Sequence, residues 1–90
     1  MAETLTKDQI RAPFTTRGIR ARVVSYDPVG TGQTMAEIEP IPRGWWYIEI
    51  RRNGMVLLFY DRTGGMEPDR IAEHARGLTV LAAACAELQT

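Results

Sequence analysis

The sequence predicts a small α+β domain: a short N-terminal helix, a four-stranded antiparallel sheet built as a meander, and a C-terminal helix packed on one sheet face. Three observations predict it, namely a helix-capping pattern near the start, four β-rich runs in the middle, and an apolar stripe at helical spacing near the end. The chain has 90 residues, and 44% of them are hydrophobic and 24% charged. That balance is typical of one globular domain spanning residues 1–90.

The first helix begins at a capping box. Thr6 is suited to the N-cap position, and Gln9 follows at the third helical position, from which its side chain can reach back. Leu5 and Ile10 can form the accompanying hydrophobic staple. Pro13 disfavours helical torsions in the residue before it, so we expect the helix to end near residue 12.

Two strands are expected over residues 19–26 and 34–39. The first alternates, with Ile19, Ala21 and Val23 on one face and Arg20, Arg22, Val24 and Tyr26 on the other. A turn over 27–33 contains one proline and two glycines. Two prolines at positions 40 and 42 predict that residues 40–44 form either an extended connector or a strand edge.

Residues 45–52 and 55–62 form the strongest predicted unit, a hairpin around Asn53 and Gly54. Both residues tolerate positive φ, which favours a two-residue type I′ turn. That loop length places Ile48 opposite Phe59 and Ile50 opposite Leu57. The expected core face carries Trp46, Ile48, Ile50, Leu57 and Phe59. The other face carries Trp45, Tyr47, Glu49, Arg51, Val56, Leu58, Tyr60 and Arg62.

A long helix is expected after Pro68, which is suited to a first helical turn. Its apolar stripe consists of Ile71, Ala75, Leu78, Leu81, Ala82, Cys85 and Leu88. Gly77 marks either close packing on the sheet or a kink. Only this helix has enough apolar surface to cover the core face of the sheet.

Composition excludes several classes of function. Eleven basic and eleven acidic residues cancel to a formal charge of zero, which argues against a polybasic nucleic-acid coat or membrane anchor. Ten of the basic residues are arginine, which either GC-rich coding or recognition of carboxylates and phosphates would explain. The single cysteine excludes an intramolecular disulfide. No apolar run is long enough to span a bilayer, and the expected location is the cytoplasm.

The chain is not expected to be an enzyme or to hold a cofactor or metal. His74 and Cys85 lie eleven residues apart, about 16 Å along a straight helix, and cannot hydrogen-bond there. Cys85 is interpreted as a core thiol and His74 as a boundary residue. Glu37 and Glu39 could serve acid–base chemistry or a cation, but pairing with Arg20 and Arg22 explains them more simply.

The candidate site is the sheet face opposite the expected core. Its binding residues are Trp45, Tyr47, Glu49, Arg51, Tyr60 and Arg62, together with Arg20 and Arg22. Aromatic residues and arginine are enriched at protein interfaces. We therefore expect a small non-enzymatic protein-binding module or inhibitor of accessory or phage-like type. Two structural alternatives would bury this face: coverage by the N-terminal residues Leu5, Ile10 and Phe14, or a homodimer.

Nucleic-acid binding through a three-stranded sheet is the second expectation for function. In outline, the Gly44-Trp45 start, the Asn53-Gly54 hairpin and the following helix resemble the arm-binding domain of phage-type integrases. The resemblance implies that the sheet would contact DNA. However, residues 55–60 lack the alternating basic side chains of a strand that reads a groove, so no family is assigned. A third alternative is an enzyme subunit whose active site is shared across an interface.

Overall fold

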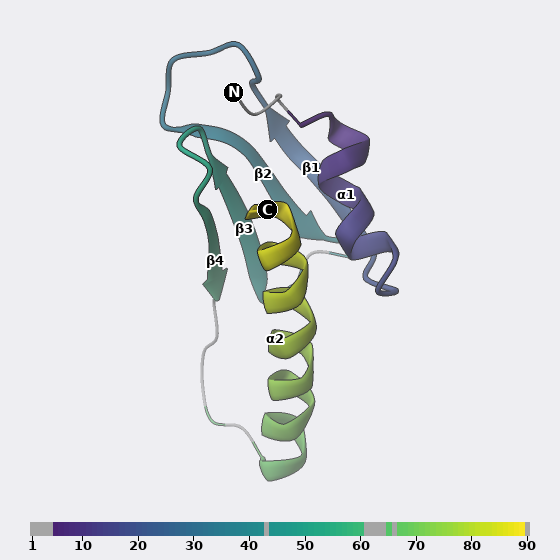
Figure 1. The fold of residues 1–90 in the computed structure, drawn as a ribbon. Coiled ribbons are helices and arrows are strands. Elements are labelled where there is room, and N and C mark those ends of the chain that lie inside the picture. Colours follow the sequence, from purple (N-terminus) through teal and green to yellow (C-terminus); the bar gives the residue numbers. More distant parts are fainter. Residues whose placement is uncertain (1–4, 43, 61–64, 66, 90) are drawn as a thin grey trace.

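The structure is a computed structural model and describes residues 5–42, 44–60, 65 and 67–89. In chain order the elements are α1 (Lys7–Thr15), β1 (Ala21–Tyr26), β2 (Thr34–Pro40), β3 (Trp46–Arg51), β4 (Val56–Tyr60) and α2 (Pro68–Gln89). The strands form one antiparallel sheet in the order β1-β2-β3-β4. Both helices lie on the same side of this sheet (Figure 1). The predicted α+β meander is confirmed, and we call the helix-covered side the inner face and the opposite side the outer face.

Helix α1 begins where the sequence predicts and ends later. The Thr6 hydroxyl accepts a bond from the Gln9 N–H (3.1 Å), and the Gln9 side chain accepts one from the Thr6 N–H (2.8 Å). The expected end near residue 12 is wrong, because the helix continues through Pro13 to Thr15. Pro13 cannot donate a helical hydrogen bond. Burial of Phe14, which is 0% exposed, offsets that loss.

The hydrophobic core lies between the inner face and the two helices. Its buried members are Ile10, Phe14, Met35, Ala36, Ile38, Trp46, Ile48, Ile50, Leu81 and Ala84. The Phe14 ring stacks on Trp46, with 6.1 Å between the ring centroids. The N-terminal segment therefore packs on the inner face, and the alternative in which it covers the aromatic face is wrong. Trp46, Ile48 and Ile50 are core residues, as predicted.

The hairpin of β3 and β4 is shifted by one residue from the predicted register. Ile48 lies opposite Leu58 rather than opposite Phe59. A shift of one residue moves every side chain of a strand to the other face. The predicted core positions of Leu57 and Phe59 are therefore wrong. These two side chains belong to the outer face, while Val56 and Leu58 pack against the core.

The turn explains the shift. The loop spans three residues, 52–54, because the N–H of Arg51 bonds to the carbonyl of Met55 (2.8 Å). Gly54 has a φ of 93°, and no described residue other than glycine has a positive φ. A type I′ turn needs positive φ at Asn53 as well. Asn53 instead accepts a hydrogen bond from the Met55 N–H through its side-chain oxygen (2.9 Å), which favours the longer loop.

Helix α2 is uninterrupted and longer than the sheet that it covers. The N-terminal half of α2 extends past the ends of the strands (Figure 1). The buried residues of the helix, Leu81 and Ala84, lie in its C-terminal half. Ile71 is 54% exposed, so the first part of the predicted apolar stripe does not reach the core. A Cβ at Gly77 would lie 3.5 Å from the Trp45 ring, which is ordinary van der Waals contact, so α2 packs on Trp45 here with room for a methyl group. None of the described helices is both long and apolar enough to cross a membrane.

Candidate interaction surface

The structure divides the predicted binding residues between the two faces of the sheet. Tyr47, Glu49 and Arg51 lie on the outer face with Arg22, as predicted. Tyr60 does not join them, because the shifted register pairs it with Trp46 on the inner face. The Trp45 ring packs against α2 at Gly77. The predicted site of Trp45, Tyr47 and Tyr60 on one surface is therefore wrong.

Trp45 and Tyr60 instead hold α2 on the sheet. Their rings meet edge to face at 5.0 Å between centroids, and the His74 ring lies 4.6 Å from that of Trp45. The Tyr60 hydroxyl is 3.3 Å from Nδ1 of His74. This cluster gives His74 the boundary position expected for it. The aromatic residues here serve packing between the helix and the sheet.

The outer face is a different surface from the one predicted. Its side chains are Arg22, Val24, Ser25, Thr34, Glu37, Glu39, Tyr47, Glu49, Arg51, Leu57 and Phe59. Tyr47 and Phe59 are neighbours on β3 and β4, and their rings stack at 4.7 Å and 8°. Tyr47 is 39% exposed and Val24, at the bulge of β1, is 45% exposed. No helix among the described residues lies on this face.

The charges of the outer face form a mixed network. Arg22 pairs with Glu39 at 2.5 Å across β1 and β2, which confirms part of the expected pairing. Glu49 accepts a hydrogen bond from Thr34 (2.8 Å) and lies 3.7 Å from Nε of Arg51.

Glu37 differs from the other two carboxylates. It lies directly opposite Glu49 and accepts a hydrogen bond from the hydroxyl of Ser25 (3.2 Å). No cation among the described residues pairs with it. Like charges opposite one another in a sheet repel. Among the described residues, the centre of the face therefore carries one carboxylate without a cationic partner.

A hollow of about 280 Å³ opens beside this carboxylate. Val24, Glu37, Glu39, Gly44, Trp45, Trp46 and Tyr47 line it. Two of these lining residues are carboxylates and three are aromatic. The hollow can accept a side chain that is both cationic and apolar along its length, such as lysine or arginine.

One of the predicted binding residues, Arg20, is not part of the outer face. Arg20 is exposed just before β1 and lines a shallow hollow with Asp8 and Arg11 of α1, away from the aromatic pair. Arg62 lies outside the described residues. The sequence analysis placed Phe59 and Leu57 in the core instead of on this face, and it placed Val24 beside Arg22 without including it in the candidate site. The signal available was that Asn-Gly also fits a three-residue loop with glycine last, which reverses the faces of β4.

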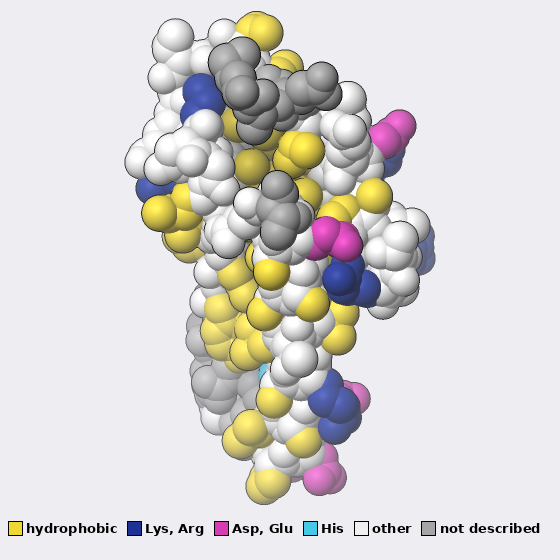
Figure 2. Space-filling model, viewed as in Figure 1, with side chains coloured by type: hydrophobic (Ala, Val, Ile, Leu, Met, Phe, Trp, Pro, Cys, Tyr) yellow, Lys and Arg dark blue, Asp and Glu magenta, His cyan; other side chains and the backbone are white. Residues whose placement is uncertain are grey.

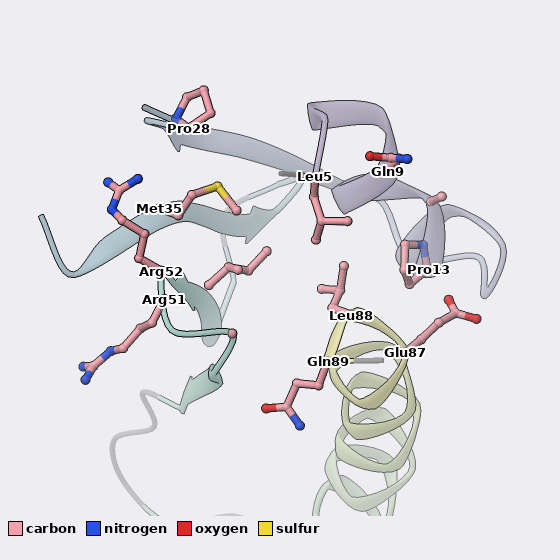
Figure 3. Close-up of a pocket in the computed structure, with 13 residues that line it drawn as sticks. Leu5, Gln9, Pro13, Pro28, Met35, Arg51, Arg52, Glu87, Leu88 and Gln89 are labelled. Carbon is pink, nitrogen blue, oxygen red and sulfur yellow. The ribbon is translucent and has the colours of Figure 1, made fainter. Parts of the chain in front are cut away.

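A larger hollow lies on the other side of the molecule, between α1, the end of α2 and the hairpin loop. Its volume is about 640 Å³. Leu5 and Leu88 point into it, whereas the guanidinium groups of Arg51 and Arg52 point away (Figure 3). Arg52 instead holds the loop after β1 through the carbonyls of Asp27 (2.7 Å) and Gly32 (2.6 Å). The hollow lacks the converging polar groups of a ligand site.

Catalytic groups are sparse in the part of the chain that the structure describes. Burial raises the pKa of the half-buried Cys85 thiol, so the reactive thiolate is disfavoured near neutral pH. Within the described ranges no group of three or more His, Cys, Asp or Glu side chains is placed to hold a metal ion. Comparison with protein families, curated proteins and solved structures finds no match to this chain. The surface geometry is therefore the basis for any functional inference.

Proposed function

We propose that this protein is a non-enzymatic protein-binding module, acting as an inhibitor or accessory factor through the outer face of its sheet. One observation carries the proposal: both helices cover the same side, so the outer face has no cover among the described elements. An exposed sheet face that carries a stacked aromatic pair is a common kind of interaction surface. A cytoplasmic location belongs to the proposal, because a single thiol fits a reducing compartment.

The aromatic pair supplies the binding energy in this proposal. Tyr47 and Phe59 are rigid rings already held by stacking, so ordering them on binding costs little entropy. Leu57 beside them extends the apolar contact. Centrally placed aromatic residues typically contribute most of the energy of an interface. We therefore assign the main contact to the Tyr47–Phe59 pair.

The charges of the outer face favour a protein partner over a nucleic acid. Three carboxylates (Glu37, Glu39 and Glu49) stand against two guanidinium groups (Arg22 and Arg51) among the described outer-face residues. A phosphate backbone would be repelled by this balance. A protein with a lysine or arginine opposite Glu37 would fill the hollow and balance the carboxylate. Binding of that kind would depend modestly on salt.

Affinity capture from the native host tests the proposal with matched variants. The baits are the wild-type chain, Tyr47→Glu on the outer face, and Ala83→Glu on the exposed side of α2. We expect one protein to be recovered by the wild type and by Ala83→Glu, and to be lost with Tyr47→Glu. Thermal melts establish that each bait is folded. Recovery that does not depend on Tyr47 would refute the assignment of the outer face.

A further inference from the structure

The two edges of the sheet differ in how they are protected. β1 carries the charged Arg22, and its pairing is interrupted by a bulge between Val23 and Ser25. Charges and bulges are the usual devices that keep an edge from pairing with another strand. β4 is the other edge, and its residues Val56–Tyr60 (VLLFY) contain neither a charge nor a register shift. The β4 edge is thus open to pairing.

The hydrogen-bonding direction of each β4 residue follows from the hairpin. Arg51 and Met55 form a hydrogen-bonded pair, so Leu57 and Phe59 also direct their backbone groups toward β3. Val56, Leu58 and Tyr60 direct theirs outward. The N–H of Val56 confirms this, because it donates to Oε1 of Gln89 at the end of α2 (2.9 Å). The same alternation turns the N–H of Leu58 away from β3, toward the open side of the edge.

One side of α2 continues this edge. Ile71, Leu78, Ala82 and Gln89 are spaced by seven, four and seven residues, which places them on the same side of the helix. Gln89 reaches the outward side of β4, so that side of α2 is turned toward the edge. Hydrophobic side chains gather along the β4 side of α2, whereas charged ones lie along the opposite side (Figure 2). Ile71 and Ala82 are exposed there.

We propose that two copies of this chain form a symmetric dimer by pairing their β4 edges and packing these sides of α2 together. Antiparallel pairing centred on Leu58 places Leu58 opposite Leu58 of the second copy. It also places Leu57 opposite Phe59 of the second copy. Val56 then lies opposite Tyr60 of the second copy, whose carbonyl replaces Oε1 of Gln89 as the acceptor for the Val56 N–H. Every such pair is apolar, so no like charges meet, as a two-fold interface requires of a self-complementary surface. Pairing through β1 would instead place Arg22 of both copies in one interface.

The α2 side gives the dimer the area that a short edge lacks. A five-residue edge alone falls short of the roughly 1,200 Å² that stable interfaces bury. Ala82 and its small neighbours allow two helices to approach closely. The dimer interface goes beyond the proposed function, since it uses the β4 edge and one side of α2 instead of the outer face. Pairing of the two edges would join the two sheets into one continuous sheet. Either proposal can therefore fail alone.

Sedimentation of the full chain over a range of concentrations tests the dimer. We expect wild type to reach twice the chain mass of 10.1 kDa. Ala82→Glu should shift the protein to the monomer mass, because it places a charge in the seam. Ala83→Glu is the matched control, one residue further round on the exposed side, and should remain dimeric. Circular dichroism establishes that the variants are folded.

Amide hydrogen exchange gives a second readout on the wild-type chain. The N–H of Leu58 should be protected at concentrations where the dimer forms and should exchange fast on dilution. The N–H of Leu57 should stay protected in both conditions, since it bonds to β3. A wild type that is monomeric at all concentrations, with a rapidly exchanging Leu58 amide, would overturn the proposal. So would a dimer that Ala82→Glu leaves intact.

Discussion

Replacing Gly77 by alanine should stabilise the protein. Glycine within a helix costs about 1 kcal/mol relative to alanine, mainly through the entropy of the unfolded chain. The new Cβ would lie 3.5 Å from the Trp45 ring, which is ordinary van der Waals contact, and Gly77 has no positive φ. We therefore expect a gain of about 1 kcal/mol, or roughly 4–8 °C in melting temperature for a domain of this size.

Urea unfolding followed by circular dichroism measures this change. The transition midpoint should rise for Gly77→Ala with an unchanged dependence on urea. Gly54→Ala is the matched control, because Gly54 has a φ of 93°, and it should lower stability by about 1 kcal/mol or more. A lower midpoint for Gly77→Ala would refute the reasoning. It would mean that the contact between Trp45 and α2 is too close for a methyl group.

The remaining stability and reactivity predictions rest on burial. Ile48→Ala should lower the free energy of unfolding by about 2–5 kcal/mol, measured with urea, because Ile48 is 0% exposed on the inner face of the sheet. Leu58→Ala should lower the free energy of unfolding more than Leu57→Ala does, because Leu58 packs against the core. The reverse order would support the register predicted from the sequence. Cys85 should react with iodoacetamide slowly in the native state, with a pH midpoint above that of an unfolded thiol, since burial raises its pKa. Because the folded pKa is the higher one, stability should fall as pH rises through it, and Cys85→Ala should reduce that alkaline loss.

The order of elements could be predicted because each carries a local signal. The Thr6–Gln9 capping box fixed the start of α1, and the alternation of β3 placed Ile48 in the core. The end of α1 could not be predicted from Pro13 alone. Burial of Phe14 in the core is a tertiary effect, and it outweighs the local preference.

The candidate site was predicted only in part, because the length of the β3–β4 loop determines which side chains of β4 lie on each face of the sheet. Asn53 and Gly54 fit either a two-residue or a three-residue loop, and the choice exchanges Leu58 with Phe59. Tyr47 was placed correctly because the alternation of β3 does not depend on the loop. The outer face is uncovered because both helices pack on the other side of the sheet. No local sequence pattern determines on which side a helix packs.

Calorimetric titration of the captured partner against wild type and Phe59→Ala tests the central claim most directly. The outer-face account predicts that Phe59→Ala weakens binding by about tenfold or more, with an unchanged fold and a modest salt dependence. Equal affinity of the two chains would contradict the account. A parallel titration with duplex DNA should give no micromolar binding, and binding that falls steeply with salt would equally contradict it.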